Sequence, residues 1–210
     1  MEFQELNFYI LIIFAVYLGI LTTHLIIRAS KSETRRKNYY FSIAIFSGFY
    51  LLCRIMLTIN FLLMNDPHSI IYIWATFFVL IGFAGLMFSV EKFIFTKLKF
   101  IPTLFILIFA SLVLIFPEYN GTNMVTYWAI AGGAFGILIP FLYLYVGYKS
   151  AGEIRKISYI IAIGTLIFII GKTMNTVMFQ EEILILWVLA PILMIIGLMI
   201  FHYGIMKQVT

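Results

Sequence analysis

The chain has 210 residues, of which 63% are hydrophobic and 11% are charged, and its formal net charge is +5 at pH 7. Soluble domains carry about 25% charged residues, so this composition excludes an ordinary soluble protein and a disordered chain. The apolar runs are continuous, and they are longer than the alternating segments of roughly ten residues that form outer-membrane barrels. We therefore expect an all-α integral membrane protein.

Seven apolar stretches follow one another along the chain, and we predict that each one crosses the membrane. Six of them reach the ~20 residues needed to span the hydrocarbon, and the fourth lies at the low end of the range. The predicted spans are 7–27, 39–64, 69–90, 101–116, 124–146, 157–178 and 183–203. Because the connections are short, we expect a single seven-helix bundle over residues 1–210 in which sequence neighbours are antiparallel.

Lysine and arginine occur in alternate connections, and this asymmetry predicts the orientation of the bundle. Twelve of the fourteen basic residues fall in the connections 28–38, 91–100 and 147–156 or in the C-terminal tail, and the other two lie within spans. We expect the N-terminus outside and the C-terminus in the cytoplasm of a multi-pass protein of the cell membrane. The first basic connection either contacts anionic headgroups of the lipid bilayer or only sets the topology.

Arg54 lies near the middle of the second predicted span, at a depth where a charge is costly. Such a residue generally faces the interior of a bundle or a water-filled cavity. Ser47, Tyr50, Arg54 and Thr58 are spaced at i, i+3, i+7 and i+11, which places them on one polar stripe of a helix. We expect the Arg54 guanidinium to face the interior and to meet an anionic ligand group, water or exposed carbonyls.

A second group of polar and aromatic residues lies in the outer half of the predicted membrane. Lys172 and Asn175 fall near the outer end of the sixth span, and tryptophans lie near the outer ends of three others. One interpretation is an outward-facing pocket for a small anionic or lipid-like ligand. The other is an ordinary interfacial tryptophan belt with Lys172 reaching outward to water. The candidate ligand-binding residues are Arg54, Lys172, Asn175, Thr58, Tyr50, Trp74, Trp128 and Trp187.

Two glycine pairs are candidates for close helix packing. Gly132 and Gly136 form a small-xxx-small pair in the fifth span, and Gly82 with Gly85 thins the third. Small residues of this kind let helix backbones approach each other. We expect them to pack helices within the bundle, and the alternative is an oligomer formed through the face of Gly132.

The sequence carries no recognisable catalytic arrangement. It has no GxSxG or HExxH motif, and every acidic residue, Glu91 included, falls at a predicted interface. His24 and His202 have no third ligand beside them, so packing is favoured over a metal site. The last span contains no lysine that could hold retinal. We expect no enzyme activity, no cofactor, no metal and no nucleic-acid partner.

The segment 148–156, Tyr-Lys-Ser-Ala-Gly-Glu-Ile-Arg-Lys, forms a basic turn that leads into a glycine-containing sixth span. In this turn and in its topology the chain resembles the seven-helix sensor modules at the front of prokaryotic membrane histidine kinases. The resemblance implies a sensor, and since the chain has no kinase domain, a cytoplasmic signalling partner would supply the output. The alternative is a small transporter or channel subunit whose pathway is lined by the polar stripes of the second and sixth spans.

Overall fold

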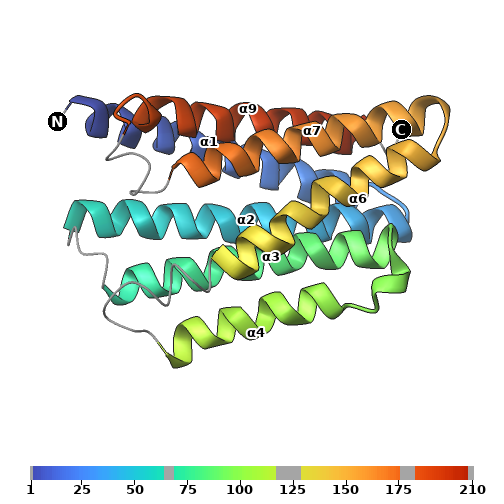
Figure 1. The fold of residues 1–210 in the computed structure, drawn as a ribbon, viewed down its shortest axis with the longest axis horizontal. Helices are drawn as coiled ribbons and strands as arrows, with labels where there is room; N and C mark the ends of the chain where they lie inside the picture. Colours follow the sequence, from blue (N-terminus) through green and yellow to red (C-terminus); the bar gives the residue numbers. More distant parts are fainter. Residues whose placement is uncertain (1, 64–68, 117–128, 176–182, 208–210) are drawn as a thin grey trace. The chain divides into compact units, whose positions relative to one another are not determined.

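The computed structural model describes residues 2–63, 69–116, 129–175 and 183–207, and these residues are helical, with no strand among them (Figure 1). The helices are α1 (Glu2–Ser30), α2 (Thr34–Leu63), α3 (Ile70–Phe93), the 3-10 turn η1 (Thr96–Leu98), α4 (Ile101–Ile115), the π-helical turn η2 (Ala129–Ala134), α6 (Phe135–Lys149), α7 (Gly152–Met174) and α9 (Leu186–Lys207). The expectation of an all-α protein is confirmed for the described part of the chain.

Among the described residues, five helices are long and apolar enough to cross a membrane, and they are α1, α2, α3, α7 and α9. The helices α4 and α6 are equally apolar but have only 15 residues each. Along α1 the side chains of Tyr9, Ile13, Val16 and Ile20 are exposed at helical spacing. A continuous apolar face of this kind is unfavourable in water and suits contact with lipid. The helices therefore support a multi-pass membrane protein.

Several helices extend past the predicted spans at the ends that carry lysine and arginine. α2 begins at Thr34, α7 begins at Gly152 and α9 ends at Lys207, each four or five residues beyond the predicted apolar boundary. Hydropathy marks only the part of a helix that lies in hydrocarbon. Lysine, arginine and glutamate are good helix formers, so the backbone hydrogen bonds continue into the polar flank.

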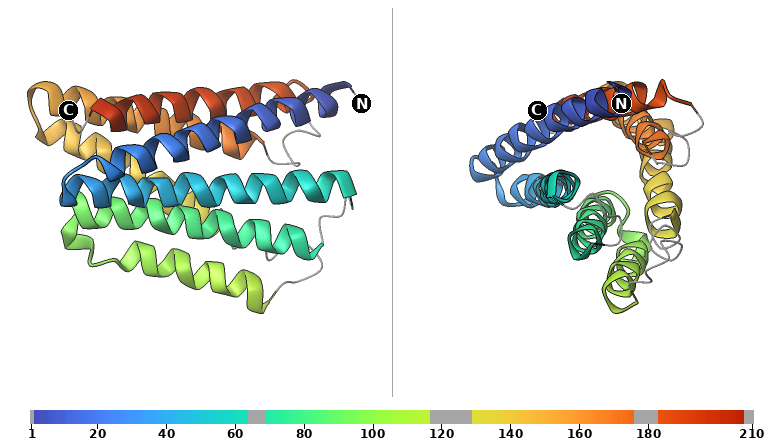
Figure 2. Two further views of the ribbon diagram at one scale, coloured as in Figure 1. Left: turned by 180° about the vertical axis from the view of Figure 1, so that it is seen from behind. Right: turned by 90° about the vertical axis from the view of Figure 1, so that its left-hand side faces the viewer.

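The chain divides into two compact units, the central unit (Leu18–Gly136) and the terminal unit (Met1–Tyr17 with Ile137–Thr210). In the central unit α3 lies between α2 and α4 (Figures 1 and 2). A Cβ atom on Gly82 would lie 3.1 Å from the carbonyl oxygen of Phe46, and one on Gly85 would lie 2.9 Å from Cγ2 of Ile45. The missing side chains thus allow α3 to pack closely against α2.

In the terminal unit, glycines form the contact between α7 and α9. Gly164 and Gly171 on α7 are seven residues apart, as are Gly197 and Gly204 on α9, so each pair recurs after about two turns. A Cβ on Gly164 would lie 2.4 Å from the backbone nitrogen of Phe201, and one on Gly197 would lie 2.3 Å from that of Phe168. We call these four residues the glycine seam. The glycines predicted from the sequence to pack helices, Gly82, Gly85, Gly132 and Gly136, are different residues.

Glu91 near the end of α3 caps the start of α4 within the central unit. The residue before α4, Phe100, is left-handed (φ 60°) and its side chain makes no capping hydrogen bond. The Glu91 carboxylate instead accepts hydrogen bonds from the Thr103 backbone N–H, at 3.3 Å, and from the Thr103 hydroxyl. A negative charge is favourable at a helix N-terminus, where N–H groups lack partners. Glu91 lies near the end of α3, where the sequence predicts a membrane interface, and its side chain is only 1% exposed.

Candidate ligand-binding site

The polar stripe of α2 is largely buried in the structure. Ser47 and Tyr50 are fully buried, Arg54 is 5% exposed, and Thr58 is partly exposed. Their helical spacing places the four residues on one face of α2, as geometry requires. The charge at the centre of α2 is therefore enclosed by protein and does not lie on the exposed surface of the helix.

Arg54 and Tyr50 form a direct polar pair one helical turn apart. The Arg54 Nη2 atom donates a hydrogen bond to the Tyr50 hydroxyl at 3.1 Å, and the Arg54 Cζ atom lies 5.3 Å from the centroid of the Tyr50 ring. Hydrogen bonds and cation–π contacts are stronger in a buried, low-dielectric setting than in water. These contacts hold the guanidinium within the central unit.

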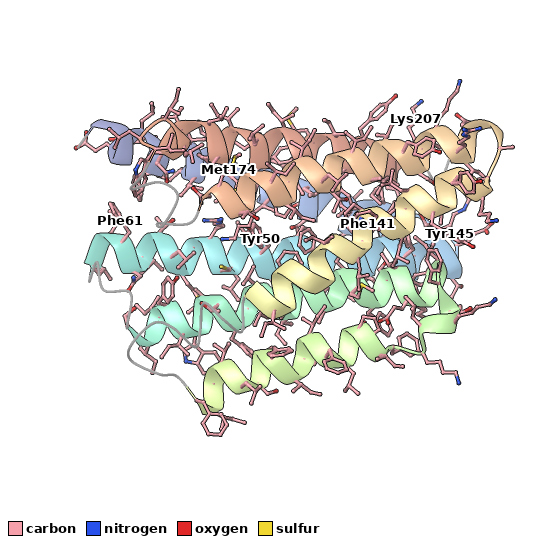
Figure 3. The ribbon with its side chains drawn as sticks, in the orientation of Figure 1. Tyr50, Phe61, Phe141, Tyr145, Met174 and Lys207 are labelled. Atoms are coloured by element: carbon pink, nitrogen blue, oxygen red, sulfur yellow. The ribbon has the colours of Figure 1, made fainter. Side chains whose placement is uncertain are left out.

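Aromatic and hydroxyl contacts fix the rest of the stripe. The Tyr50 ring stacks on Phe46, with centroids 5.9 Å apart, and meets Phe83 of α3 edge to face at 6.5 Å. Figure 3 shows Tyr50 on α2, within the central unit. Ser47 lies one turn before Tyr50 on α2, and its Oγ atom accepts a hydrogen bond from the Thr22 hydroxyl of α1 at 2.9 Å. The Tyr50 end of the Arg54–Tyr50 pair is thus supported by packed neighbours.

The chemistry of the pair favours an anion. A guanidinium carries five N–H donors in a planar fork that matches a carboxylate or phosphate, and it stays protonated at any physiological pH. Helix α2 contains no acidic residue at all. A carboxylate that reached Arg54 would gain a charge-assisted, bidentate contact beside aromatic rings that suit an apolar chain.

In the terminal unit, Asn7 makes hydrogen bonds to two of the predicted ligand residues, Asn175 and Trp187. Asn7 of α1 is buried, and its Nδ2 atom donates hydrogen bonds to Asn175 Oδ1, at 3.3 Å, and to the backbone oxygen of Trp187. The Asn175 backbone N–H donates to Gly171 O at 3.0 Å and so ends α7. Lys172, one turn earlier, is partly buried. Asn7 therefore connects α1 with the end of α7 and the start of α9.

The predicted ligand residues include three tryptophans, of which Trp74 is the most clearly exposed in the described part of the chain. Trp74 is 39% exposed, and its ring contacts those of Phe77 and Phe78 at centroid distances of 5.6 and 5.9 Å. This exposure suits an interfacial belt. Trp128 lies outside the described residues. Of the remaining predicted ligand residues, the central unit holds Tyr50, Arg54, Thr58 and Trp74, and the terminal unit holds Lys172, Asn175 and Trp187.

Sequence reasoning missed three polar residues that the structure places in inter-helix contacts. They are Asn7, Thr22 and Asn60, the last of which accepts a hydrogen bond from the Ser69 hydroxyl. Ser69 in turn accepts from the Tyr72 backbone N–H at 3.2 Å and caps α3. Serine before an apolar run is a recognised cap signal, and an asparagine inside an apolar run indicates an inter-helix hydrogen bond.

The predicted packing glycines and histidines have different settings. Gly132 lies in the π-helical turn η2, and Gly136 is buried near the start of α6. His202 Nδ1 lies 3.0 Å from the Tyr17 hydroxyl in the terminal unit. Within the described ranges there is no group of three histidine, cysteine or acidic residues that could hold a metal.

Comparison with protein-family models, with curated proteins and with solved structures finds no match to this chain. The functional argument therefore depends on the geometry of its own residues. Among the predicted ligand residues, Arg54 and Tyr50 make a direct and buried side-chain pair, and they are the centre of the candidate site.

Proposed function

We propose that the protein is a non-enzymatic membrane sensor that binds a small anionic or lipid-like ligand and passes the signal to a cytoplasmic partner. It crosses the membrane seven times, with α4 and α6 as short spans, and its N-terminus lies outside. The membrane assignment rests on five long apolar helices. The orientation rests on the alternation of basic connections in the sequence.

The observation that carries the proposal is the buried Arg54–Tyr50 pair. Inserting an arginine at the centre of a membrane helix costs about 2.5–3.5 kcal/mol. An arginine at that depth is therefore expected to have a role that needs its charge, such as binding an anion. At 5% exposure Arg54 does not face lipid. A ligand carboxylate would contact the guanidinium, and the neighbouring aromatic rings of Tyr50 and Phe83 would contact its chain.

Equilibrium binding of radiolabelled octanoate to the purified full chain in an uncharged detergent tests this proposal. Octanoate combines a carboxylate with an apolar chain. We expect one saturable site in the wild type and, in Arg54→Gln, a loss of at least roughly tenfold in affinity, since a charge-assisted contact contributes about 1.5–3 kcal/mol. The matched control is Arg36→Gln, which removes an exposed arginine from the start of α2.

The control should bind octanoate as the wild type does. Equal losses in both variants would mean that octanoate responds to the overall positive charge of the protein. Saturable binding that survives in Arg54→Gln would show that a ligand site, if present, does not use this arginine. Either result contradicts the proposed role of the pair.

The second candidate function, a small transporter or channel subunit, draws on the polar face of α7. Ser158 and Thr165 are buried there at a spacing of seven residues, which gives the terminal unit a polar stripe of its own. Flux of chloride or labelled octanoate from liposomes separates the two functions. A sensor gives the same leak as empty liposomes. A transporter whose pathway uses the polar stripe of α2 as well as that of α7 gives a larger flux, and this flux falls in Arg54→Gln.

A further inference from the structure

Basic and aromatic side chains are paired at the end of the terminal unit where α6 turns into α7. The Nζ atom of Lys149 lies 5.7 Å from the centroid of the Tyr148 ring, and the guanidinium carbon of Arg155 lies 5.8 Å from that of Tyr159. On α9, the Nζ atom of Lys207 lies 6.0 Å from the centroid of Tyr203. Contacts of this length are cation–π pairs.

These pairs emerge at one end of the unit because α7 and α9 are antiparallel. A Cβ atom on Gly204 would lie 2.5 Å from Cγ1 of Ile161, so the last turn of α9 lies beside the first half of α7. Figure 3 labels Lys207 and Tyr145 at this end, and Figure 2 shows the turn from α6 to α7 beside the end of α9. The turn is itself compact, since a Cβ on Gly147 would meet the Tyr159 ring at 2.9 Å.

The surface at this end is strongly positive and amphipathic. Lys149, Arg155, Lys156 and Lys207 are all exposed, and the acidic residue in the same turns is Glu153. Tyr148 is 73% exposed and Tyr203 is 55% exposed. Exposed tyrosines beside cations are typical of the headgroup level of a bilayer, where the ring meets acyl chains and the polar groups meet phosphate.

We propose that this end of the terminal unit, formed by Lys149, Arg155, Lys156 and Lys207 with the rings of Tyr148, Tyr159 and Tyr203, binds the phosphate headgroups of anionic phospholipids. The rings hold the basic groups at headgroup depth and the positive charge selects anionic over zwitterionic lipid. The occupant is a membrane lipid because the site combines charge with exposed aromatic surface, and a soluble phosphate would use only the charge.

Native mass spectrometry of the full chain, titrated with phosphatidylglycerol or with phosphatidylcholine, tests the proposal. The variant Lys149→Gln/Arg155→Gln/Lys156→Gln should bind phosphatidylglycerol at least roughly tenfold more weakly, because each basic group near an anionic surface contributes about 1 kcal/mol. Its binding of phosphatidylcholine should not change. The matched control, Lys31→Gln/Lys97→Gln/Lys99→Gln, removes the same charge from exposed positions outside this surface and should weaken phosphatidylglycerol binding much less.

Two further measurements keep the test decisive. The charge-preserving variant Lys149→Arg/Arg155→Lys/Lys156→Arg should keep its preference for phosphatidylglycerol, and circular dichroism should show that all variants are folded. Inorganic phosphate at matched ionic strength should leave phosphatidylglycerol bound. The proposal is overturned if both triple glutamine variants lose equal affinity, if the first loses none, or if inorganic phosphate displaces the lipid.

Discussion

Replacing Gly197 with alanine adds a single methyl group at the closest approach of α7 and α9. Its Cβ would lie 2.3 Å from Phe168 N and 2.7 Å from Gly164 O. Real Cβ atoms essentially never come within 3.0 Å of such atoms, so the nearest contact must lengthen by at least about 0.7 Å. Both of these neighbours are backbone atoms and cannot rotate away. The whole helix must move, and the side chains packed along it must move as well.

The size of the effect follows from two opposing terms. Alanine in a helix is favoured over glycine by roughly 0.5–1 kcal/mol. Overpacking a well-packed interface typically costs about 1–3 kcal/mol. Because the added methyl group meets backbone, the upper half of that range, about 2–3 kcal/mol, applies. After the helix gain is subtracted, we expect the free energy of unfolding to fall by about 1–2.5 kcal/mol.

The assay is unfolding of the purified protein by increasing mole fractions of sodium dodecyl sulfate, followed by far-ultraviolet circular dichroism. The matched control is Gly48→Ala, whose Cβ would lie 3.6 Å from Thr22 Cγ2 at an ordinary van der Waals distance. We expect Gly48→Ala to leave stability unchanged or raised. If Gly197→Ala is as stable as Gly48→Ala, α7 and α9 do not pack through the glycine seam.

Two further predictions concern the cap of α4 and the topology. Glu91→Leu should lower the free energy of unfolding by about 1–3 kcal/mol, because it leaves the Thr103 N–H and hydroxyl buried without the Glu91 acceptor. Glu91→Gln keeps an acceptor oxygen and should lose less stability. The same unfolding assay measures both variants, and equal stability of the wild type and both variants would rule out the cap. Cysteines introduced at Ser32 and Thr122 should react with a membrane-impermeant maleimide from opposite sides, with Thr122, which lies outside the described residues, labelled from outside in a Cys53→Ala background. Labelling of both from one side would contradict seven spans with this orientation.

The parts of the fold that depend on local pattern could be predicted from the sequence. Continuous apolar runs of this length can only be helices in a membrane, and each described helix of 15 residues or more overlaps one of the predicted spans. The pairing of Arg54 with Tyr50 follows from a separation of four residues, because residues i and i+4 are neighbours on a helix. Both inferences need only one segment at a time.

The contacts between helices could not be predicted in the same way. Nothing in the run around Glu91 indicates that its carboxylate turns toward Thr103, and nothing around Asn7 indicates Asn175, 168 residues later. Such pairs depend on which helices pack together and in which register. The seven-residue spacing of Gly164 with Gly171 and of Gly197 with Gly204 is visible in the sequence, but glycines occur at many spacings, and only the packed helices show which of them meet.

The most direct test of the ligand-binding account is the thermal stability of Arg54→Leu with and without octanoate. A saturating ligand stabilises the protein it binds, by about 2.7 kcal/mol at 100 times its dissociation constant. The account predicts that octanoate raises the melting temperature of the wild type and leaves that of a folded Arg54→Leu unchanged. It also predicts no gain in ligand-free stability, because leucine removes the hydrogen bond that Arg54 donates to the buried Tyr50 hydroxyl. A variant that is more stable than the wild type and still responds to octanoate would contradict the account.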